Sequence, residues 1–264
     1  MATWRGEPYP EYVSAAERRL RAERHRKALL RQGLAPRPIA IEGRDLARTF
    51  WGEAWCAHIE SLADLATRLP RGRSYLRNGA VLHLEISRGA VRARVSGTEL
   101  YQIEIGIVPL APARWSAVRR ACAGRIASAV ELLSGKLSSA VMTVLCDPGR
   151  GIFPGSEELE LSCSCPDGAR LCKHLAAVLY GVGARLDRAP ELLFTLRGVE
   201  LEELVAAAGR AGARAGRDAP AAALTDAQLA EIFGIELVGA AADRRAGSGK
   251  PARGARRQRR RARR

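Results

Sequence analysis

The chain carries two kinds of hydrophobic periodicity, and they occupy separate stretches. From residue 49 to residue 69, apolar side chains recur at helical spacing and include Trp51, Trp55, Ile59, Leu62, Leu65 and Leu69. Apolar residues three and four apart share one face of a helix, so this stripe predicts a helix whose tryptophans lie in the core. Pro70 and Gly72 are expected to end it.

From Ser74 to about residue 108 the period changes to two. The segments VLHLEIS, AVRARVSG and LYQIEIGIV alternate apolar and polar positions, with the turns RG and GTE between them. Such alternation is typical of half-buried antiparallel strands. Asn78-Gly79 precedes them and is a strong hairpin signal. The stretch therefore predicts an antiparallel β-meander.

Helical patterns surround this meander. They are expected over residues 14–32, 112–133, 138–146, 175–186, 200–208 and 225–238, and ELELSC before Cys165 is strand-like. Strands and helices in blocks favour an α+β fold: an antiparallel meander with flanking helices. We expect a basic helix and connector over 1–48, an α+β domain over 49–150, a metal-binding segment over 151–190, a helical segment over 191–243 and a tail over 244–264.

The positive charge is concentrated at the C-terminal end. Of the formal net charge of +15, eleven Arg or Lys residues lie in residues 244–264, which leaves +4 for residues 1–243. A Gly/Arg run without large apolar residues predicts a disordered tail. It includes Arg256, Arg257, Arg259, Arg260 and Arg261. The tail is interpreted either as an electrostatic contact with nucleic acid or as a solubilising segment without a fixed partner.

The N-terminal stretch has no apolar signal-peptide core, and no run approaches the roughly 20 apolar residues of a membrane span. We therefore expect a cytoplasmic protein without a membrane partner. In that compartment thiols stay reduced, so clustered cysteines hold metal more often than they form disulfides.

The stretch CSCPDGARLCKH gathers such a cluster, with the spacing Cys163-x-Cys165-x6-Cys172-x-His174. Two thiols two apart on an extended chain point to one face, and the Pro-Asp-Gly segment turns the chain back toward a helix. Three thiols and one imidazole form a closed tetrahedral set, which indicates structural Zn²⁺.

Other chemistry for the cluster is less well supported. A Cys163–Cys165 disulfide would close a strained ring, and no base accompanies a nucleophilic cysteine. Catalytic zinc usually keeps an open position, whereas here four ligands are available.

Three further patterns invite comparison with metal or nucleotide sites. Cys56-Ala57-His58 lies within a predicted helix, where residues two apart diverge, so Cys56 is expected in the core and His58 on the surface. His83 is expected on the polar face of a strand, opposite Leu82 and Leu84. Cys122 and Cys146 are most simply buried thiols, and GSGKP lacks the elements of a phosphate loop.

A second candidate surface is RLPRGRSYLRNG. On the expected strand, Arg73, Tyr75 and Arg77 alternate on one face. Charges for phosphates with a ring for stacking are typical of nucleic-acid binders, although a solvated sheet face would look the same. The candidate nucleic-acid contacts here are Arg68, Arg71, Arg73, Tyr75 and Arg77.

The chain also resembles a known family. CSCPDGARLCKHLAAVLYGVG is similar to the SWIM zinc finger, with C-x-C, a variable gap and C-x-H, and every ligand position matches. TFWGEAWC, RLPRGRSYLRNG and APELLFTLRG resemble bacterial SWIM zinc finger proteins over residues 38–208. The resemblance implies a ββα zinc unit that binds nucleic acid or protein, and a link to Swi/Snf-type helicases.

Together these patterns predict a non-enzymatic, zinc-stabilised α+β accessory protein that binds DNA or RNA without sequence preference. The alternative is a protein–protein adaptor whose finger docks a helicase without touching nucleic acid. A zinc hydrolase is a third and more remote interpretation, since it needs an open zinc position and a nearby general base.

Overall fold

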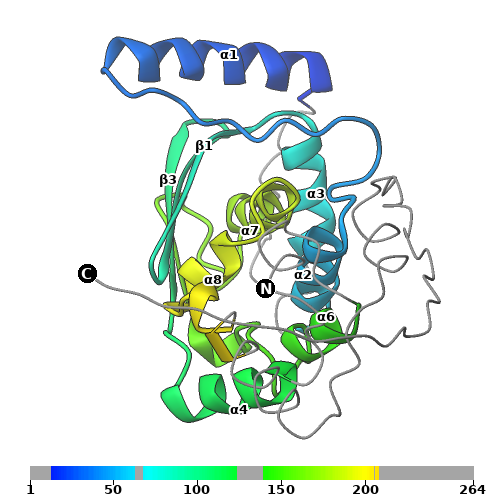
Figure 1. The fold of residues 1–264 in the computed structure, drawn as a ribbon. Coiled ribbons are helices and arrows are strands. Elements are labelled where there is room, and N and C mark those ends of the chain that lie inside the picture. Colours follow the sequence, from blue (N-terminus) through cyan, green and yellow to red (C-terminus); the bar gives the residue numbers. More distant parts are fainter. Residues whose placement is uncertain (1–12, 63–67, 124–138, 205, 208–264) are drawn as a thin grey trace, which may run out of the picture. The chain divides into compact units, whose positions relative to one another are not determined.

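The computed structural model describes residues 13–62, 68–123, 139–204, 206 and 207. The α+β prediction is confirmed: helices flank a four-stranded antiparallel sheet (Figure 1). The helices are α1 Ala15–Arg31, α2 Phe50–Ser61, α3 Leu69–Arg77, α4 Pro112–Ala123, α6 Ser139–Leu145, α7 Lys173–Leu186 and α8 Leu192–Arg197. The strands are β1 Val81–Ser87, β2 Ala90–Ser96, β3 Leu100–Ile107 and β4 Leu159–Cys163.

The sheet order is β1-β2-β3-β4, and every neighbouring pair is antiparallel. The predicted meander accounts for β1 to β3, joined by the turns Arg88-Gly89 and 97–99. One face carries the expected apolar positions, such as Val91, Ala93 and Val95 on β2, and all three are fully buried. On the other face polar side chains of β2 and β3 alternate with these positions, and Arg92 pairs with Glu104 at 3.3 Å.

Helix α7 lies between the sheet and helices α2 and α3 (Figure 1). Its large apolar residues are buried, namely Leu175, Val178, Leu179, Val182 and Leu186. The small residues on its other faces, which include Ala176, Ala177 and Gly181, are buried as well. Trp55 of α2 is fully buried and donates its indole N–H to the Leu179 carbonyl over 2.8 Å. The expectation that the tryptophans of the stripe over 49–69 lie in the core is confirmed for Trp51 and Trp55.

The expected strand through residues 74–77 is wrong, because this segment belongs to helix α3. Leu69, Gly72 and Leu76 recur at helical spacing and are buried. A Cβ on Gly72 would lie 2.9 Å from the backbone nitrogen of Ala177, so α3 approaches α7 as closely as glycine allows. Packing against α7 therefore favours a helix in this segment. Asn78-Gly79 connects α3 to β1 and does not form a hairpin.

Two further expectations change. The predicted helix over 49–69 is interrupted: α2 ends at Ser61, residues 63–67 lie outside the described part, and Leu69 belongs to α3. On β1, the pairing register shifts between Val81 and His83, as at a β-bulge. Leu82 therefore leaves the face of Leu84 and packs against Ala22 and Leu29 of α1, in a cluster separate from the main core.

The basic helix expected over 14–32 is confirmed as α1, which begins after the N-cap Ser14. Residues 201–204 are helical, in agreement with part of the helix expected near 200–208. Helix 112–133 is confirmed as far as Ala123, and its remainder lies outside the described residues, as do the helix 225–238 and the tail 244–264. In the part of the chain that the structure describes, no helix combines the length and apolar character needed to cross a bilayer.

Candidate metal centre

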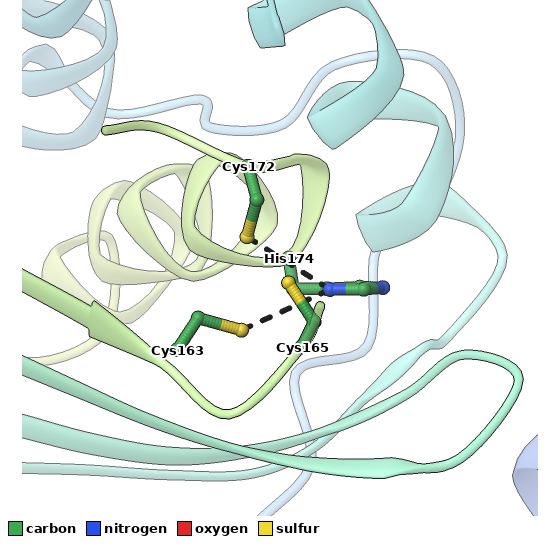
Figure 2. A group of neighbouring side chains, drawn as sticks. All are labelled: Cys163, Cys165, Cys172 and His174. Atoms are coloured by element: carbon green, nitrogen blue, oxygen red, sulfur yellow. Dashed lines mark hydrogen bonds between the residues drawn. The ribbon is translucent and has the colours of Figure 1, made fainter. Parts of the chain in front are cut away.

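The four predicted ligands converge at one end of β4 (Figure 2). Cys163 is the last residue of β4, where its register with Ile103 of β3 fixes the backbone. The next residue is tied to β3 as well, because the Ser164 N–H donates to the Gln102 carbonyl over 3.0 Å. Cys165 follows in the loop, Cys172 is the N-cap of α7, and His174 lies in the first turn of that helix.

The donor atoms fit a single tetrahedral ion. All four lie within 4.8 Å of one another. The His174 Nδ1 atom is 3.9 Å from the Cys163 sulfur and 3.8 Å from the Cys172 sulfur. Zn–S bonds of about 2.3 Å and Zn–N bonds of about 2.0 Å place tetrahedral donors roughly 3.5–3.8 Å apart. Cys163, Cys165, Cys172 and His174 are therefore positioned to bind one metal ion, and the set of three thiols and one imidazole is consistent with Zn²⁺.

The thiols are not electrostatically equivalent. Hydrogen bonds with Cys163 and His174, and one from the Leu175 N–H, lower the pKa of Cys172 to about 3, although burial acts in the opposite direction. The hydrogen bond with Cys172 and burial together raise the pKa of Cys163. Because a metal needs thiolates, the N-terminus of α7 supplies a preformed place for negative charge.

Two aromatic rings and a turn hold the His174 side chain in place. Its ring lies 4.4 Å from that of Tyr101 and 5.3 Å from that of Tyr75, measured between centroids. Gly97, in the turn between β2 and β3, is also close, because a Cβ there would lie 2.8 Å from His174 Nε2. The ring is thereby oriented with Nδ1 toward the sulfurs, and Nε2 is buried without a hydrogen-bond partner among the described residues.

The metal centre is built into the main core of the described residues. Strand β4 completes the sheet, and Leu175, Val178 and Leu179 of α7 share one hydrophobic cluster with β1, β2 and β3. Strand β4 pairs with β3 of the meander and is followed by α7, so the ligand segment joins the same sheet. The boundaries 151–190 stay a prediction.

The structure divides the arginines of the second candidate surface between two sides of α3. Arg73 donates to the Tyr180 hydroxyl and to Glu60, and Arg77 donates to the Arg44 carbonyl. Their expected alternation with Tyr75 on a strand face is wrong, because residues two apart diverge on a helix. Arg68 pairs with Asp167 of the ligand loop at 3.8 Å.

Arg71 and Tyr75 lie one helical turn apart and line a pocket next to the metal centre. Sequence reasoning missed the other cations of this pocket, Arg18 and Arg21 of α1 and Lys173 of α7. The ammonium nitrogen of Lys173 lies 5.7 Å from the centre of the Tyr75 ring. Only the spacing of Arg18 and Arg21, three apart on one helix, hinted at a shared face.

The remaining candidates lie elsewhere. The candidate contacts of the tail, Arg256, Arg257, Arg259, Arg260 and Arg261, are outside the described residues, so they stay a prediction.

Two histidines outside the metal centre, His58 and His83, are buried. His58 is not on the surface, contrary to expectation: its Nε2 lies 2.8 Å from the Pro154 carbonyl oxygen, and its ring packs against Phe153. His83 is also buried, and it accepts the Arg37 N–H at Nδ1 over 3.2 Å. Cys122 is fully buried, as expected. Cys56 and Cys146 are half-buried, and burial raises the pKa of each of these two thiols to about 12.

Comparison with known proteins agrees with this centre. The SWIM zinc finger family model matches residues 143–182, which include all four ligands. A protein of Mycobacterium tuberculosis (strain ATCC 25618 / H37Rv), named "Uncharacterized protein Rv2102", is 40% identical over 196 residues. The alignment covers 71% of this chain and 70% of that protein. No solved structure matches the chain.

Proposed function

The chain belongs to the same protein family as Rv2102 and carries a SWIM zinc finger, and from this premise we propose that it is a non-enzymatic nucleic-acid-binding protein. Its zinc has a structural role in this proposal. Four protein donors complete a tetrahedral set and leave no position for a substrate or an activated water. The protein would then act through the surfaces that the metal positions.

The observation that carries the proposal is the charge of α1. This helix has seven Arg or Lys residues against two Glu, and only Ala22 and Leu29 are buried. Most of its cationic side chains therefore face solvent, where they can contact phosphates. Such contacts carry no sequence information, so we propose binding to DNA or RNA without sequence preference.

The tail over 244–264 is proposed to add to this binding through its eleven positive charges. We further propose that the protein acts in the cytoplasm, where thiols stay available as zinc ligands.

Partnership with a Swi/Snf-type helicase, which the resemblance implies, is the alternative proposal. The large apolar side chains Leu20 and Leu30 of α1 are about half exposed, which favours a protein contact on the same helix. Purification of the tagged protein from native lysate, with and without nuclease, separates the two functions. A helicase retained after nuclease treatment supports the adaptor, and its loss supports nucleic acid as the link.

Binding itself is tested by fluorescence anisotropy with duplex and single-stranded oligonucleotides over a range of salt concentrations. On duplex DNA, affinity should fall with salt at a log–log slope of about −0.9 per phosphate neutralised. A chain that ends at residue 243 should show a slope flatter by several units. An unchanged affinity and slope would make the tail a solubilising segment, and no binding by the full chain would overturn the proposed function.

A further inference from the structure

A pocket of about 460 Å³ opens beside the metal centre, between α1, α3, the β2–β3 turn and the first residue of α7. Four cationic side chains line it: Arg18, Arg21, Arg71 and Lys173. Its lining contains no carboxylate among the described residues. Positive charge collected in a hollow from three separate helices attracts an anion more strongly than the same charges spread over a surface.

Three of the four cations of the pocket form no ion pair with a described residue. The Nε atom of Arg18 is buried and has no hydrogen-bond partner in the described part of the chain. Arg71 and Lys173 form no ion pair with a described residue, whereas Arg21 pairs with Glu17 at 3.0 Å. A buried guanidinium nitrogen without an acceptor is costly, and a phosphate oxygen would supply one.

The other walls suit the remainder of a nucleotide. Tyr75 contributes a half-buried ring, and Ser74, Asn78 and Thr98 add hydroxyl and amide groups. Aromatic rings bind bases by stacking, and polar side chains can pair with the edges of a base or with a sugar. The volume lies within the range of pockets that take small ligands and cofactors.

We propose that this pocket binds one phosphorylated nucleotide, either free or as a unit of a single strand, with its phosphate among Arg18, Arg71 and Lys173. The inference deepens the proposed function and rests on it where the nucleotide belongs to a strand. It also gives the zinc a role in binding, because Lys173 lies between the ligands Cys172 and His174 in sequence and Tyr75 packs on His174.

The test compares two double variants of the full chain that remove the same charge. The pocket variant, Arg18→Ala with Arg71→Ala, removes two of the four cations that line the pocket. The control variant, Arg19→Ala with Arg24→Ala, removes two exposed arginines of α1 that lie outside it. Each is titrated with a short mixed-sequence single strand and, separately, with a nucleoside monophosphate. Zinc content and thermal unfolding verify the fold, and the single variant Arg71→Met replaces the pocket double if that protein does not fold.

We expect the pocket variant to bind the single strand about tenfold more weakly than the control variant, with a salt slope flatter by roughly 0.7 for the phosphate contact that is lost. Saturable binding of the monophosphate by the wild type, lost only in the pocket variant, supports the free nucleotide as a ligand. Strand binding that depends on the pocket, with no monophosphate binding, restricts the ligand to a strand.

Equal losses in both doubles would overturn the pocket and leave the proposed function intact. If the wild type binds no strand, the proposed function fails, and the monophosphate titration alone decides the pocket. Saturable binding then supports it, and absence of binding overturns it as well.

Discussion

The two ends of strand β4 are fastened by different chemistry. At its C-terminal end, Cys163 joins the zinc centre and so connects the sheet to α7. At the other end, Glu158 immediately precedes the strand and meets the guanidinium of Arg197 from α8 at 2.7 Å. Arg197 is fully buried, and Arg114 of α4 adds a second positive charge 3.5 Å from Glu158. One strand is thus held by a metal at one end and by an ion pair at the other.

The two attachments also differ in how far apart their members lie along the chain. All four zinc ligands fall between residues 163 and 174. The ion-pair end brings together residues 114, 158 and 197, from three separate elements. The metal can bind its local segment while that segment forms, whereas a buried ion pair stabilises only when its surroundings are already folded and satisfy its remaining hydrogen bonds.

The largest effect is expected at the metal end. Cys172→Ser should abolish stoichiometric zinc binding and lower the free energy of unfolding by several kcal/mol, a part of the ~10–16 kcal/mol that zinc supplies in finger peptides. Because α7 shares the core of the sheet, amide exchange should rise in β1 to β3 and α2 as well as around the ligands.

Elemental analysis and hydrogen exchange measure both results for Cys172→Ser, and Cys56→Ser, a half-buried thiol outside the centre, should keep one zinc per chain. Exchange that rises only within residues 158–186 would show that the zinc segment folds as a unit of its own.

The ion-pair end should come next. Arg197→Met leaves Glu158 without its buried partner and should cost about 3–5 kcal/mol in urea unfolding, with zinc still bound. The matched control is Arg88→Met, because Arg88 pairs with Glu200 at a similar distance of 2.9 Å while both side chains are mostly exposed. Exposed pairs contribute about 0.2–1 kcal/mol. Equal costs for the two variants would show that burial of the pair is irrelevant.

A smaller effect is expected where the sheet supports the metal ligand. Gly97→Ala places a methyl group against His174 and Tyr101, and overpacking of this kind costs about 1–3 kcal/mol. Competition with a chelator should show weaker zinc binding. Gly168→Ala, in the loop between the ligands, meets no atom within 4 Å and should bind zinc as the wild type does. Unchanged affinity in Gly97→Ala would mean that the turn does not position the imidazole.

The smallest effect is the dependence of the ion-pair end on pH. Burial alone would raise the pKa of Glu158, but the Arg197 hydrogen bond, the Gly155 N–H and the charge of Arg114 lower it below the ordinary glutamate value. A lowered pKa in the folded state stabilises the protein above the unfolded pKa of about 4.3, and this stability is lost as pH falls through the folded value.

The stability difference between wild type and Glu158→Gln should therefore stay constant above about pH 5 and shrink at lower pH. Chemical unfolding of both proteins over this range measures it, and acid release of zinc cancels in the difference. A difference that grows toward low pH would contradict the assignment.

The sequence by itself determined the features that depend on near neighbours along the chain. The candidate ligands Cys163, Cys165, Cys172 and His174 could be predicted from the sequence, because a metal site needs particular donors at a short spacing. The strands β1 to β3 and the buried stripe of Trp51 and Trp55 could also be predicted, because hydrophobic periodicity indicates which face of an element is buried.

Tertiary structure decided whatever depends on contacts between distant segments. RLPRGRSYLRNG became helix α3 because Gly72 packs against α7, more than a hundred residues away. Strand β4 joined the meander through β3, and Arg197 was buried because Glu158 compensates its charge there. Arg18, Arg71 and Lys173 meet in one pocket for the same reason. Local patterns specify how each element forms, and the burial that brings elements together is a property of the whole core.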